Sequence, residues 1–284
     1  MTTCIMHEDL DGYTSAAVVY TMYGKNCKYI EMDYSRDVPF DQIESNEQII
    51  IVDFSLQKPG EWEKLREITP NTIWIDHHSS SIKNAPDFMK DAAGIRDVGG
   101  CGAMLTWKYF YPHDRPPEII ELVDKWDRNV HNEDPKVLNF VFGMEAEDIT
   151  PFSQIWELLL PVWNLYSNVD APIIQAISEN GEIIIEYERY KNIKRANKLA
   201  YEVEFEGYRC IAINVALTGR KVFESIKKKY DIWICHYYDG KQHTVSLYSE
   251  GDLRVDEIAE KYLGGGHPNA SGFQCNELPW LKEK

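Results

Sequence analysis

The first half of the chain repeats one pattern, in which a short apolar run is followed by a longer amphipathic stretch. Four apolar runs predict buried strands, at residues 2–6, 28–32, 49–52 and 72–75. Helix-like stretches lie between or after these runs, at residues 14–22, 60–67, 102–111 and 117–126. Buried strands that alternate with helices are typical of a parallel sheet with helices on both faces. The pattern predicts an α/β fold whose N-terminal domain is built on a parallel sheet.

The second half follows a different pattern and predicts a smaller α+β domain. Helical periodicity extends over two stretches, at residues 152–166 and 183–200, and the second is expected to connect two domains. Hairpins are expected farther along, at residues 204–210 and 231–248. The second hairpin contains Asp239-Gly240, a pair that suits a tight primed turn. A short helix at 255–262 then leads into a glycine-rich loop.

These patterns divide the chain into two domains and a linker. We expect an N-terminal domain at residues 1–165, a connecting helical linker at 166–202 and a smaller C-terminal domain at 203–284.

The charge and the apolar content of the chain exclude several classes of protein. There are 30 Lys and Arg against 46 Asp and Glu, a net charge of −16, which is a poor supply of cations for holding long duplex nucleic acid. No apolar run approaches the roughly 18 to 20 residues that span a bilayer, and the acidic N-terminus does not resemble a secretory signal. The six cysteines are scattered without a C-x-x-C pair, as in a chain of reduced thiols. We therefore expect a cytoplasmic protein that binds no membrane.

Acidic and imidazole side chains follow three of the four predicted strands, at the point where each strand ends. They are His7, Asp9 and Asp11 after the first strand, Asp53 after the third, and Asp76, His77 and His78 after the fourth. The carboxyl ends of parallel strands meet at one edge of a sheet, where open α/β folds bind their ligands. We expect these side chains to meet in one crevice.

So many carboxylates in one crevice would repel one another unless cations lie among them. Asp and His donors without Cys suit Mn²⁺, and they also accept Mg²⁺, Fe²⁺, Co²⁺ or Zn²⁺. There are enough donors for two ions, and paired divalent cations about 3.5 to 4 Å apart are a common device for phosphoryl hydrolysis. The sequence therefore predicts two divalent cations, with Mn²⁺ favoured.

These residues resemble the DHH phosphoesterase superfamily, which takes its name from an Asp-His-His segment such as residues 76–78. The resemblance extends to the stretch His7-Glu8-Asp9-Leu10-Asp11-Gly12, to Ser15-Ala16-Ala17 and to Asp53. Residues 264–273, which read Gly-Gly-Gly-His-Pro-Asn-Ala-Ser-Gly-Phe, look like the signature of the DHH-associated substrate-binding domain. The motifs lie at both ends of the chain, and their style is closest to the oligoribonuclease (nanoRNase-like) members.

The resemblance implies a role for each matched residue at the metal site. His7 and Asp9 would hold one cation, and Asp11 and His77 would hold the other. Asp53 would bridge both cations.

The resemblance also implies roles for the residues around the metal ligands. Asp76 would orient His77 from behind, and His78 would contact the substrate phosphate or assist proton transfer. A further acidic ligand is expected later in the chain. Asp124 is the favoured candidate and Asp127 the alternative, although a salt bridge of Asp127 with Lys125 or Arg128 accounts for that residue equally well.

The glycine-rich segment implies an anion-binding site. The bare backbone of Gly265 and Gly266 lets N–H groups approach a phosphate, and His267 adds a donor. Ser246 and Tyr248 are expected to contribute from the preceding strand. Many family members have an Arg at the position of Tyr248, and a Tyr cannot make the bidentate phosphate clamp of an Arg. The residue that grips the distal phosphate therefore stays open among Arg220, Lys221 and Arg254.

Together, these features predict a two-metal-ion phosphodiesterase of the exoribonuclease type, acting on short 5′-phosphorylated oligonucleotides or dinucleotides. The expected partner is a short oligonucleotide or a small nucleotide, and a homodimer is left open. The alternatives are a phosphatase acting on adenosine bisphosphate, a cyclic-nucleotide phosphodiesterase, and a non-catalytic nucleotide-binding regulatory module.

Overall fold

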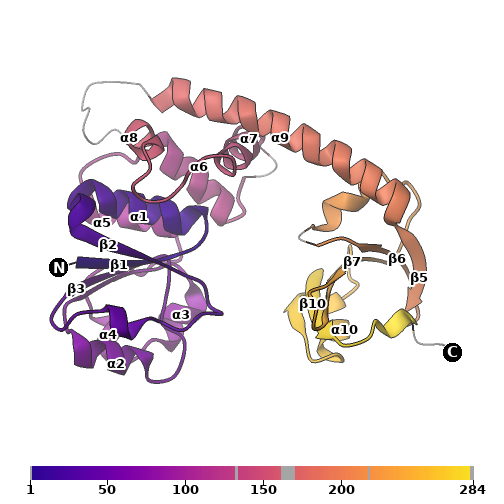
Figure 1. The fold of residues 1–284 in the computed structure, drawn as a ribbon, viewed down its shortest axis with the longest axis horizontal. Coiled ribbons are helices and arrows are strands. Elements are labelled where there is room, and N and C mark those ends of the chain that lie inside the picture. Colours follow the sequence, from indigo (N-terminus) through magenta and orange to yellow (C-terminus); the bar gives the residue numbers. More distant parts are fainter. Residues whose placement is uncertain (1, 132–133, 161–169, 217, 282–284) are drawn as a thin grey trace. The chain divides into compact units, whose positions relative to one another are not determined.

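The structure, a computed structural model, describes residues 2–131, 134–160, 170–216 and 218–281 (Figure 1). The chain divides into two compact units, Met1–Ile184 and Ile185–Lys284. Among the described residues, no helix combines the length and the apolar character that crossing a bilayer requires. The predicted domain limits stay a prediction, because the limit at residue 165 lies outside the described residues.

The N-terminal unit is built on a four-stranded parallel sheet. Its strands are β1 (Thr2–His7), β2 (Cys27–Met32), β3 (Gln48–Val52) and β4 (Thr72–Ile75), in the spatial order β2-β1-β3-β4. In register, Ile5 of β1 lies between Ile30 of β2 and Ile51 of β3. The strands lie where the apolar runs predict them, which confirms the α/β fold.

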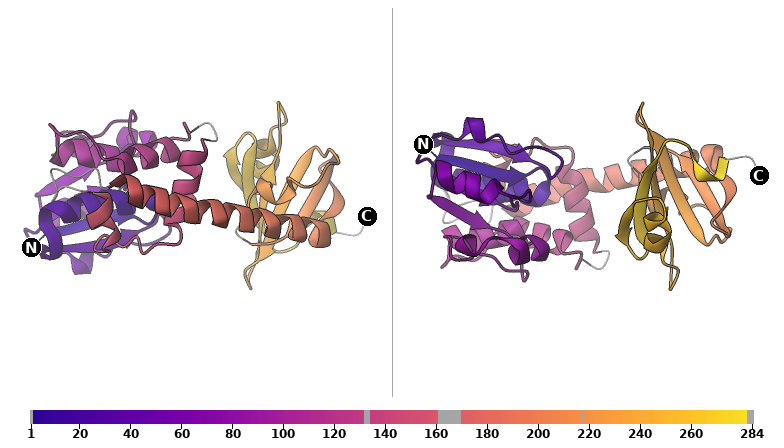
Figure 2. Two further views of the ribbon diagram at one scale, coloured as in Figure 1. Left: turned by 90° about the horizontal axis from the view of Figure 1, so that it is seen from above. Right: turned by 90° about the horizontal axis from the view of Figure 1, so that it is seen from below.

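Helices cover both faces of this sheet (Figures 1 and 2). One face is covered by α1 (Leu10–Tyr23) and α5 (Gly102–Phe110), with α6 (Glu118–Asp127) and α7 (Pro135–Met144) packed behind them. The other face is covered by α2 (Glu61–Ile68), α3 (Ser79–Asn84) and α4 (Asp87–Lys90). Because side chains alternate along a strand, Ile5 and Ile51 pack with Trp62 of α2, whereas Met6 packs with Leu105 of α5.

Two glycines allow the long helix α9 (Asp170–Leu199) to lie directly against α7. A Cβ on Gly181 of α9 would lie 1.7 Å from the carbonyl oxygen of Asn139, and a Cβ on Gly143 of α7 would lie 2.0 Å from that of Ile177. No other residue would permit this approach of the two backbones.

The helix α8 (Ile155–Leu159) occupies part of the helix expected at 152–166, of which residues 161–166 lie outside the described part. The second expected helix, at 183–200, lies within α9 except for residue 200, which follows the end of α9.

The C-terminal unit contains a six-stranded sheet. In spatial order its strands are β5 (Tyr201–Phe205), β6 (Tyr208–Asn214), β7 (Ile232–Tyr238), β8 (His243–Tyr248), β10 (Ala270–Cys275) and β9 (Gly265–His267). Neighbouring strands are antiparallel except β6 and β7. The helix α10 (Val255–Glu260) packs on one face, and the 3₁₀ helix η3 (Arg220–Phe223) lies against the other. This arrangement confirms the smaller α+β domain.

Shorter 3₁₀ helices occur elsewhere in the described residues, at η1 (Gly24–Asn26), η2 (Phe40–Gln42) and η4 (Pro279–Leu281).

The primed turn lies in a different hairpin from the expected one. Between β7 and β8, the Asp239 carboxylate accepts the N–H groups of Lys241 and Gln242 at 2.7 and 2.8 Å, which forms a longer loop. Two consecutive residues with positive φ occur instead at Glu206 and Gly207, with φ of 53° and 82°, between β5 and β6. The side-chain hydrogen bonds of Asp239 are the reason, because they stabilise the wider loop.

Candidate metal centre

The carboxyl edge of the parallel sheet gathers a cluster of acidic and imidazole side chains. Among the described residues, three sets offer ligand atoms within 4.8 Å of one another: His7, Asp9 and Asp53; Asp11, His77 and Asp127; and Asp53, His77 and His78. Asp53 and His77 each belong to two sets, so the three sets form one continuous cluster. We call these seven residues the metal cluster.

The start of α1 fixes the first part of the cluster. Asp9 is the N-cap of α1, where its Oδ1 accepts the N–H of Gly12 at 2.9 Å, and its Oδ2 lies 2.6 Å from Nδ1 of His7. This hydrogen bond raises the pKa of His7. A Cβ on Gly12 would lie 2.1 Å from the carbonyl oxygen of His7. Glycine at this position therefore lets α1 begin directly beside the end of β1.

Asp11 connects the start of α1 to the start of α5. Its two carboxylate oxygens accept the N–H groups of Gly102 and Ala103 at 2.6 and 2.7 Å. The N-terminus of a helix stabilises such an anion, although burial still raises the pKa of Asp11. Its Oδ2 lies 3.7 Å from Nε2 of His77, so the same carboxylate also faces the centre of the cluster.

Asp53 lies at the middle of the cluster with an unusual backbone. Its φ is 52°, a left-handed conformation that few side chains other than Asn and Asp adopt. Its N–H is held by the carbonyl oxygen of Ile75 at 2.9 Å, and its side chain is 1% exposed. Burial, followed by the nearby carboxylates of Asp11 and Asp9, raises the pKa of Asp53 well above its ordinary value.

Several buried polar atoms at the cluster have no hydrogen-bond partner in the described part of the chain. They include Asp53 Oδ1, His77 Nε2 and Asp127 Oδ2. Nε2 of His77 lies 3.1 Å from Asp53 Oδ1 and 3.5 Å from Asp127 Oδ2. Burial lowers the pKa of His77, which leaves the imidazole neutral and able to donate a lone pair. Unpartnered buried oxygens around a neutral imidazole fit the donor set of a divalent cation.

Asp76 contacts the imidazole ring of His78, whereas its contact with His77 is with the backbone N–H and not, as the resemblance predicts, with the ring. Its Oδ1 lies 2.8 Å from Nδ1 of His78 and also accepts the N–H groups of His77 and His78 at 2.8 and 3.1 Å. These backbone hydrogen bonds hold the carboxylate of Asp76 over the turn, and in this position it reaches the imidazole of His78. The contact raises the pKa of His78 and so favours its protonated form.

The structure places Asp127, and not the favoured Asp124, at the centre of the metal cluster. Asp124 accepts the N–H of Cys101 at 2.8 Å and a forked pair of hydrogen bonds from Arg128, which leaves it no free oxygen. Asp127 lies nearly one turn farther along α6, and its side chain faces His77. Burial raises the pKa of Asp127 to about 7, and the carboxylates of Asp11 and Asp9 add to this.

Sequence reasoning did not find an aromatic pair at the edge of the cluster. The ring of Tyr34 stacks on that of Phe54, with centroids 5.0 Å apart, and also lies 5.3 Å from the ring of His7 and 6.2 Å from that of His78. Tyr34 is 36% exposed, so it presents part of its ring to solvent beside the metal cluster. Its position just after β2, at the same edge of the sheet as the acidic residues, is the signal that could have identified it.

In the C-terminal unit, most of the predicted substrate-binding residues share one face of the sheet. Tyr248 of β8 pairs with Ala270 of β10, which pairs with His267 of β9. In the next row, Ser246 pairs with Gly272, which pairs with Gly265. Side chains in register across a sheet point to the same side.

The glycine-rich segment is a strand and not the expected loop. Gly265–His267 forms the edge strand β9. In it, Gly266 pairs with Ser271 of β10, between the Gly265–Gly272 and His267–Ala270 pairs. The φ of Gly266 is 143°, and a Cβ there would lie 2.6 Å from the Cα of Ser271. The glycines thus allow close pairing with β10. Whether β9 binds an anion stays a prediction.

Comparison with known proteins places the metal cluster in context. Residues 2–125 match the profile of the DHH family, N-terminal domain, a range that includes His7, Asp53 and His77 and ends before Asp127. An uncharacterized protein of Acanthamoeba polyphaga mimivirus is 25% identical over 292 residues, which cover 93% of this chain and 64% of that protein. The chain therefore spans slightly less than two thirds of the length of this relative.

Two solved structures share the fold. The pGpG-specific phosphodiesterase PggH from Vibrio cholerae has a TM-score of 0.58 at 14% identity, covering 97% of this chain and 94% of its own. The DHH domain of a protein assigned to a family of ribosomal proteins has a TM-score of 0.52 at 12% identity, covering 96% of this chain and 82% of its own. At these identities the likeness concerns the fold alone.

Proposed function

Residues 2–125 belong to the DHH family, N-terminal domain, and from that premise we propose that the chain is a two-metal phosphodiesterase acting on short 5′-phosphorylated oligonucleotides or dinucleotides. The observation that carries the proposal is the meeting of Asp53 Oδ1, Asp127 Oδ2 and His77 Nε2 as buried atoms without hydrogen-bond partners in the described part of the chain. Such an arrangement is costly unless a cation completes it.

The metal cluster offers donors for two ions. We infer that His7 and Asp9 would hold one ion and that Asp11, His77 and Asp127 would hold the other, with Asp53 available to either. Donors of this kind suit Mn²⁺ best. When bound, paired cations activate a water molecule near neutral pH and neutralise charge on the phosphoryl group.

The residues of the chain contribute orientation and a proton. Asp11 is held in place by the N–H groups of α5, and Asp53 by its backbone hydrogen bond to Ile75. His78 lies at the edge of the cluster, where its hydrogen bond with Asp76 raises its pKa, and in this proposal it donates a proton to the leaving oxygen.

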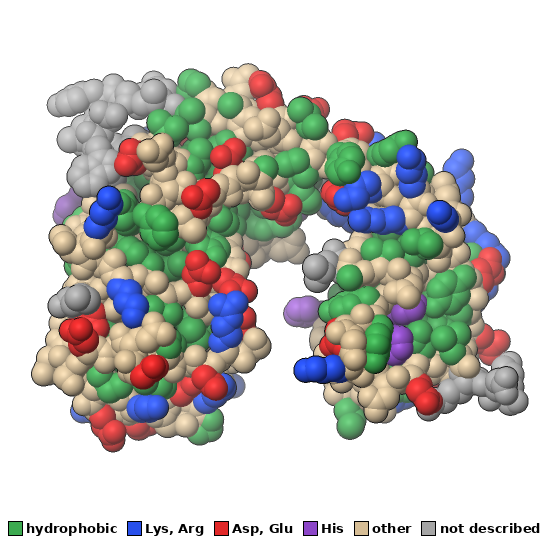
Figure 3. Space-filling view, viewed as in Figure 1, with side chains coloured by type: hydrophobic (Ala, Val, Ile, Leu, Met, Phe, Trp, Pro, Cys, Tyr) green, Lys and Arg blue, Asp and Glu red, His purple; other side chains and the backbone are tan. Residues whose placement is uncertain are grey.

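The preference for short substrates follows from the charge of the chain. At a net charge of −16, long duplexes would be repelled. Lys and Arg side chains gather over the C-terminal part of α9 (Figure 3), but Lys191 and Arg195 are paired there with Glu188. The Vibrio cholerae protein of similar fold is specific for pGpG, a dinucleotide, which agrees with the proposed size of the substrate.

The C-terminal unit is proposed to take the terminal phosphate. His267 can donate a hydrogen bond from the outer row of the sheet, and Tyr248 on the same row can add a second. Arg220, one of the candidates for the distal phosphate, is paired with Glu250 and lies over the ring of Trp233.

A substrate panel in Mn²⁺, with and without EDTA, tests the proposal. The panel contains 5′-phosphorylated RNA and DNA dinucleotides, longer single strands, adenosine bisphosphate, cyclic nucleotides and pyrophosphate. We expect dinucleotides to be hydrolysed fastest and EDTA to abolish the reaction. Fastest turnover of adenosine bisphosphate or of a cyclic nucleotide would replace the proposed substrate with that one.

Asp53→Asn is the sharpest variant, because Asn keeps the left-handed backbone and removes the charge. We expect it to lose turnover while remaining folded, whereas Asp41→Asn, at an exposed carboxylate in η2, should behave as the native protein does. Unchanged rates for Asp53→Asn would end the two-metal proposal. Nucleotide binding without hydrolysis of any substrate would identify a non-catalytic regulatory module instead.

A further inference from the structure

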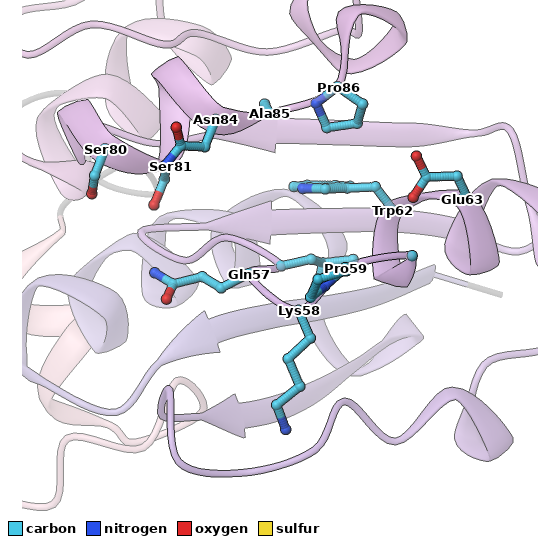
Figure 4. Close-up of a pocket in the computed structure, with 12 residues that line it drawn as sticks. Gln57, Lys58, Pro59, Trp62, Glu63, Ser80, Ser81, Asn84, Ala85 and Pro86 are labelled. Atoms are coloured by element: carbon cyan, nitrogen blue, oxygen red, sulfur yellow. The ribbon is translucent and has the colours of Figure 1, made fainter.

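A pocket of about 420 Å³ lies in the N-terminal unit between the loop that follows β3 and the helix α3 (Figure 4). One wall is formed by Leu56–Gly60 with Trp62, and the other by Ser80, Ser81 and residues 84–86. The volume lies within the range of small-molecule sites, and a nucleoside would fit in it. No role of the metal cluster accounts for this pocket.

Both segments that line the pocket follow residues of the metal cluster closely in the sequence. Leu56 follows Asp53 by three residues, and Ser80 follows His78 by two. The ring of Tyr34 lies against those of His7 and His78 at the same edge of the sheet. The chain segments that line the pocket lead directly away from the metal cluster, so a ligand in the pocket would lie near the cluster.

The walls are suited to a flat polar ring. In Figure 4 the indole of the buried Trp62 is seen edge-on between Pro59 and Pro86, so part of the lining is apolar. Gln57 and Asn84 add two exposed carboxamides, and neither side chain makes a hydrogen bond in the described part of the chain. A carboxamide offers a donor and an acceptor together, which matches the edge of a nucleobase.

The charges of the pocket argue against a phosphate as its occupant. Lys58 is paired with Asp37, and the acidic Glu63 lies in the same lining. An anion would find no unpaired cation there, whereas a neutral ring would meet apolar walls and amide groups. We propose that this pocket binds a nucleobase of the substrate whose phosphodiester lies at the metal cluster. This inference rests on the proposed function, because it assigns a substrate contact to that reaction.

Nucleoside binding without metal tests the pocket independently of catalysis. Adenosine and guanosine, which carry no phosphate, are titrated into the full-length protein in EDTA, with ribose as the control. We expect the side-chain NMR signals of Trp62, Gln57 and Asn84 to shift with the nucleosides and not with ribose. Shifts confined to other residues, or no shifts at all, would overturn the proposal.

Kinetics supply the second test. The ratio of kcat/KM for a dinucleotide to that for bis(p-nitrophenyl) phosphate, which has no base, is compared between variants. The double variant Gln57→Ala/Asn84→Ala should lower this ratio about tenfold, the loss expected when hydrogen bonds to a base are removed. Asn26→Ala, at an exposed amide outside the pocket, should leave the ratio unchanged.

The two tests separate failure of the pocket from failure of the proposed function. An unchanged ratio in the double variant, with normal dinucleotide hydrolysis, would refute the nucleobase pocket and leave the phosphodiesterase proposal standing. Nucleosides that bind at Trp62 in a protein without hydrolytic activity would support the pocket and refute the reaction.

Discussion

Arg128 holds the carboxylate of Asp124 through two hydrogen bonds, from Nε to Oδ1 at 2.9 Å and from Nη2 to Oδ2 at 2.6 Å. The N–H of Cys101 reaches the same Oδ1 at 2.8 Å. Asp124 therefore ties α6 to the start of α5, whereas Asp127 of the same helix faces His77. Two carboxylates three residues apart thus have separate tasks, one structural and one at the metal cluster.

Asp127→Asn and Asp124→Asn should consequently fail in different ways. Asp127→Asn removes a donor from the metal cluster and should lower Mn²⁺ affinity by at least about tenfold. It should not destabilise the metal-free protein, because one of several mutually repelling carboxylates is lost. Asp124→Asn should leave Mn²⁺ affinity unchanged and lower the free energy of unfolding by about 1–3 kcal/mol. Calorimetric titration with Mn²⁺ and urea denaturation measure the two effects, and the opposite pattern would restore Asp124 as the ligand.

Gly102→Ala should damage the metal cluster through packing alone. A Cβ at this position would lie 2.5 Å from the Cβ of Asp53, so either α5 or Asp53 must move. We expect weaker Mn²⁺ binding and a loss of about 1–3 kcal/mol in the free energy of unfolding. Gly99→Ala is the control, since its Cβ would meet only side-chain atoms of Asp97, at 3.2 Å or more. Equal Mn²⁺ affinity in the two variants would show that α5 does not position Asp53.

His267→Ala should affect substrate binding and not metal content. His267 lies on the edge strand of the C-terminal sheet, and the metal cluster lies in the N-terminal unit. We expect KM for a 5′-phosphorylated dinucleotide to rise about tenfold or more, as for the loss of a hydrogen bond to a charged group. The manganese content measured by mass spectrometry should equal that of Lys241→Ala, a change at the exposed β7–β8 loop. An unchanged KM would remove β9 from the substrate site.

His236 should make the C-terminal unit less stable in mild acid. Its side chain is buried, its Nε2 lies 2.7 Å from the hydroxyl of Tyr201, and burial lowers its pKa to about 4. In the unfolded chain the imidazole takes up a proton near its ordinary pKa of about 6.5, whereas the folded protein keeps it neutral. The free energy of unfolding should therefore fall as the pH is lowered from about 6.5 towards 4.

Urea denaturation at pH 7.5 and pH 5 measures this loss. His236→Asn should reduce the difference between the two pH values, because the buried imidazole is gone. His113→Asn, at an exposed histidine, should retain the native difference. A pH dependence that is the same in all three proteins would assign the acid sensitivity to other groups.

The sequence predicted those features of the site that depend on strand ends. Each apolar run has the length typical of a buried strand, and the residue after a parallel strand lies at the carboxyl edge of its sheet. His7, Asp53 and His77 follow this rule, and they meet as expected. The same rule applies to Tyr34, after β2, but an aromatic residue carries no obvious chemistry in a sequence, and it was missed.

The features that depend on the rotation of a helix or on competing hydrogen bonds could not be predicted. Asp124 and Asp127 lie on neighbouring parts of α6, and the hydrogen bonds from Arg128 and from the N–H of Cys101 hold Asp124 away from the metal cluster. For Asp76, the two backbone N–H groups decide which imidazole its oxygen reaches. The glycine run became a strand because pairing with β10 supplies hydrogen bonds that a free loop would lack.

Position 53 must meet two independent requirements: a residue that tolerates the left-handed backbone conformation, and a side chain that carries a negative charge. Gly, Asn and Asp can all take this conformation with little strain, but only Asp brings a charge that draws in a cation. A substitution of Asp53 by Asn could therefore keep the fold and remove the charge that a cation requires. Among homologous chains, residue 53 should separate those that still load metal from pseudoenzymes.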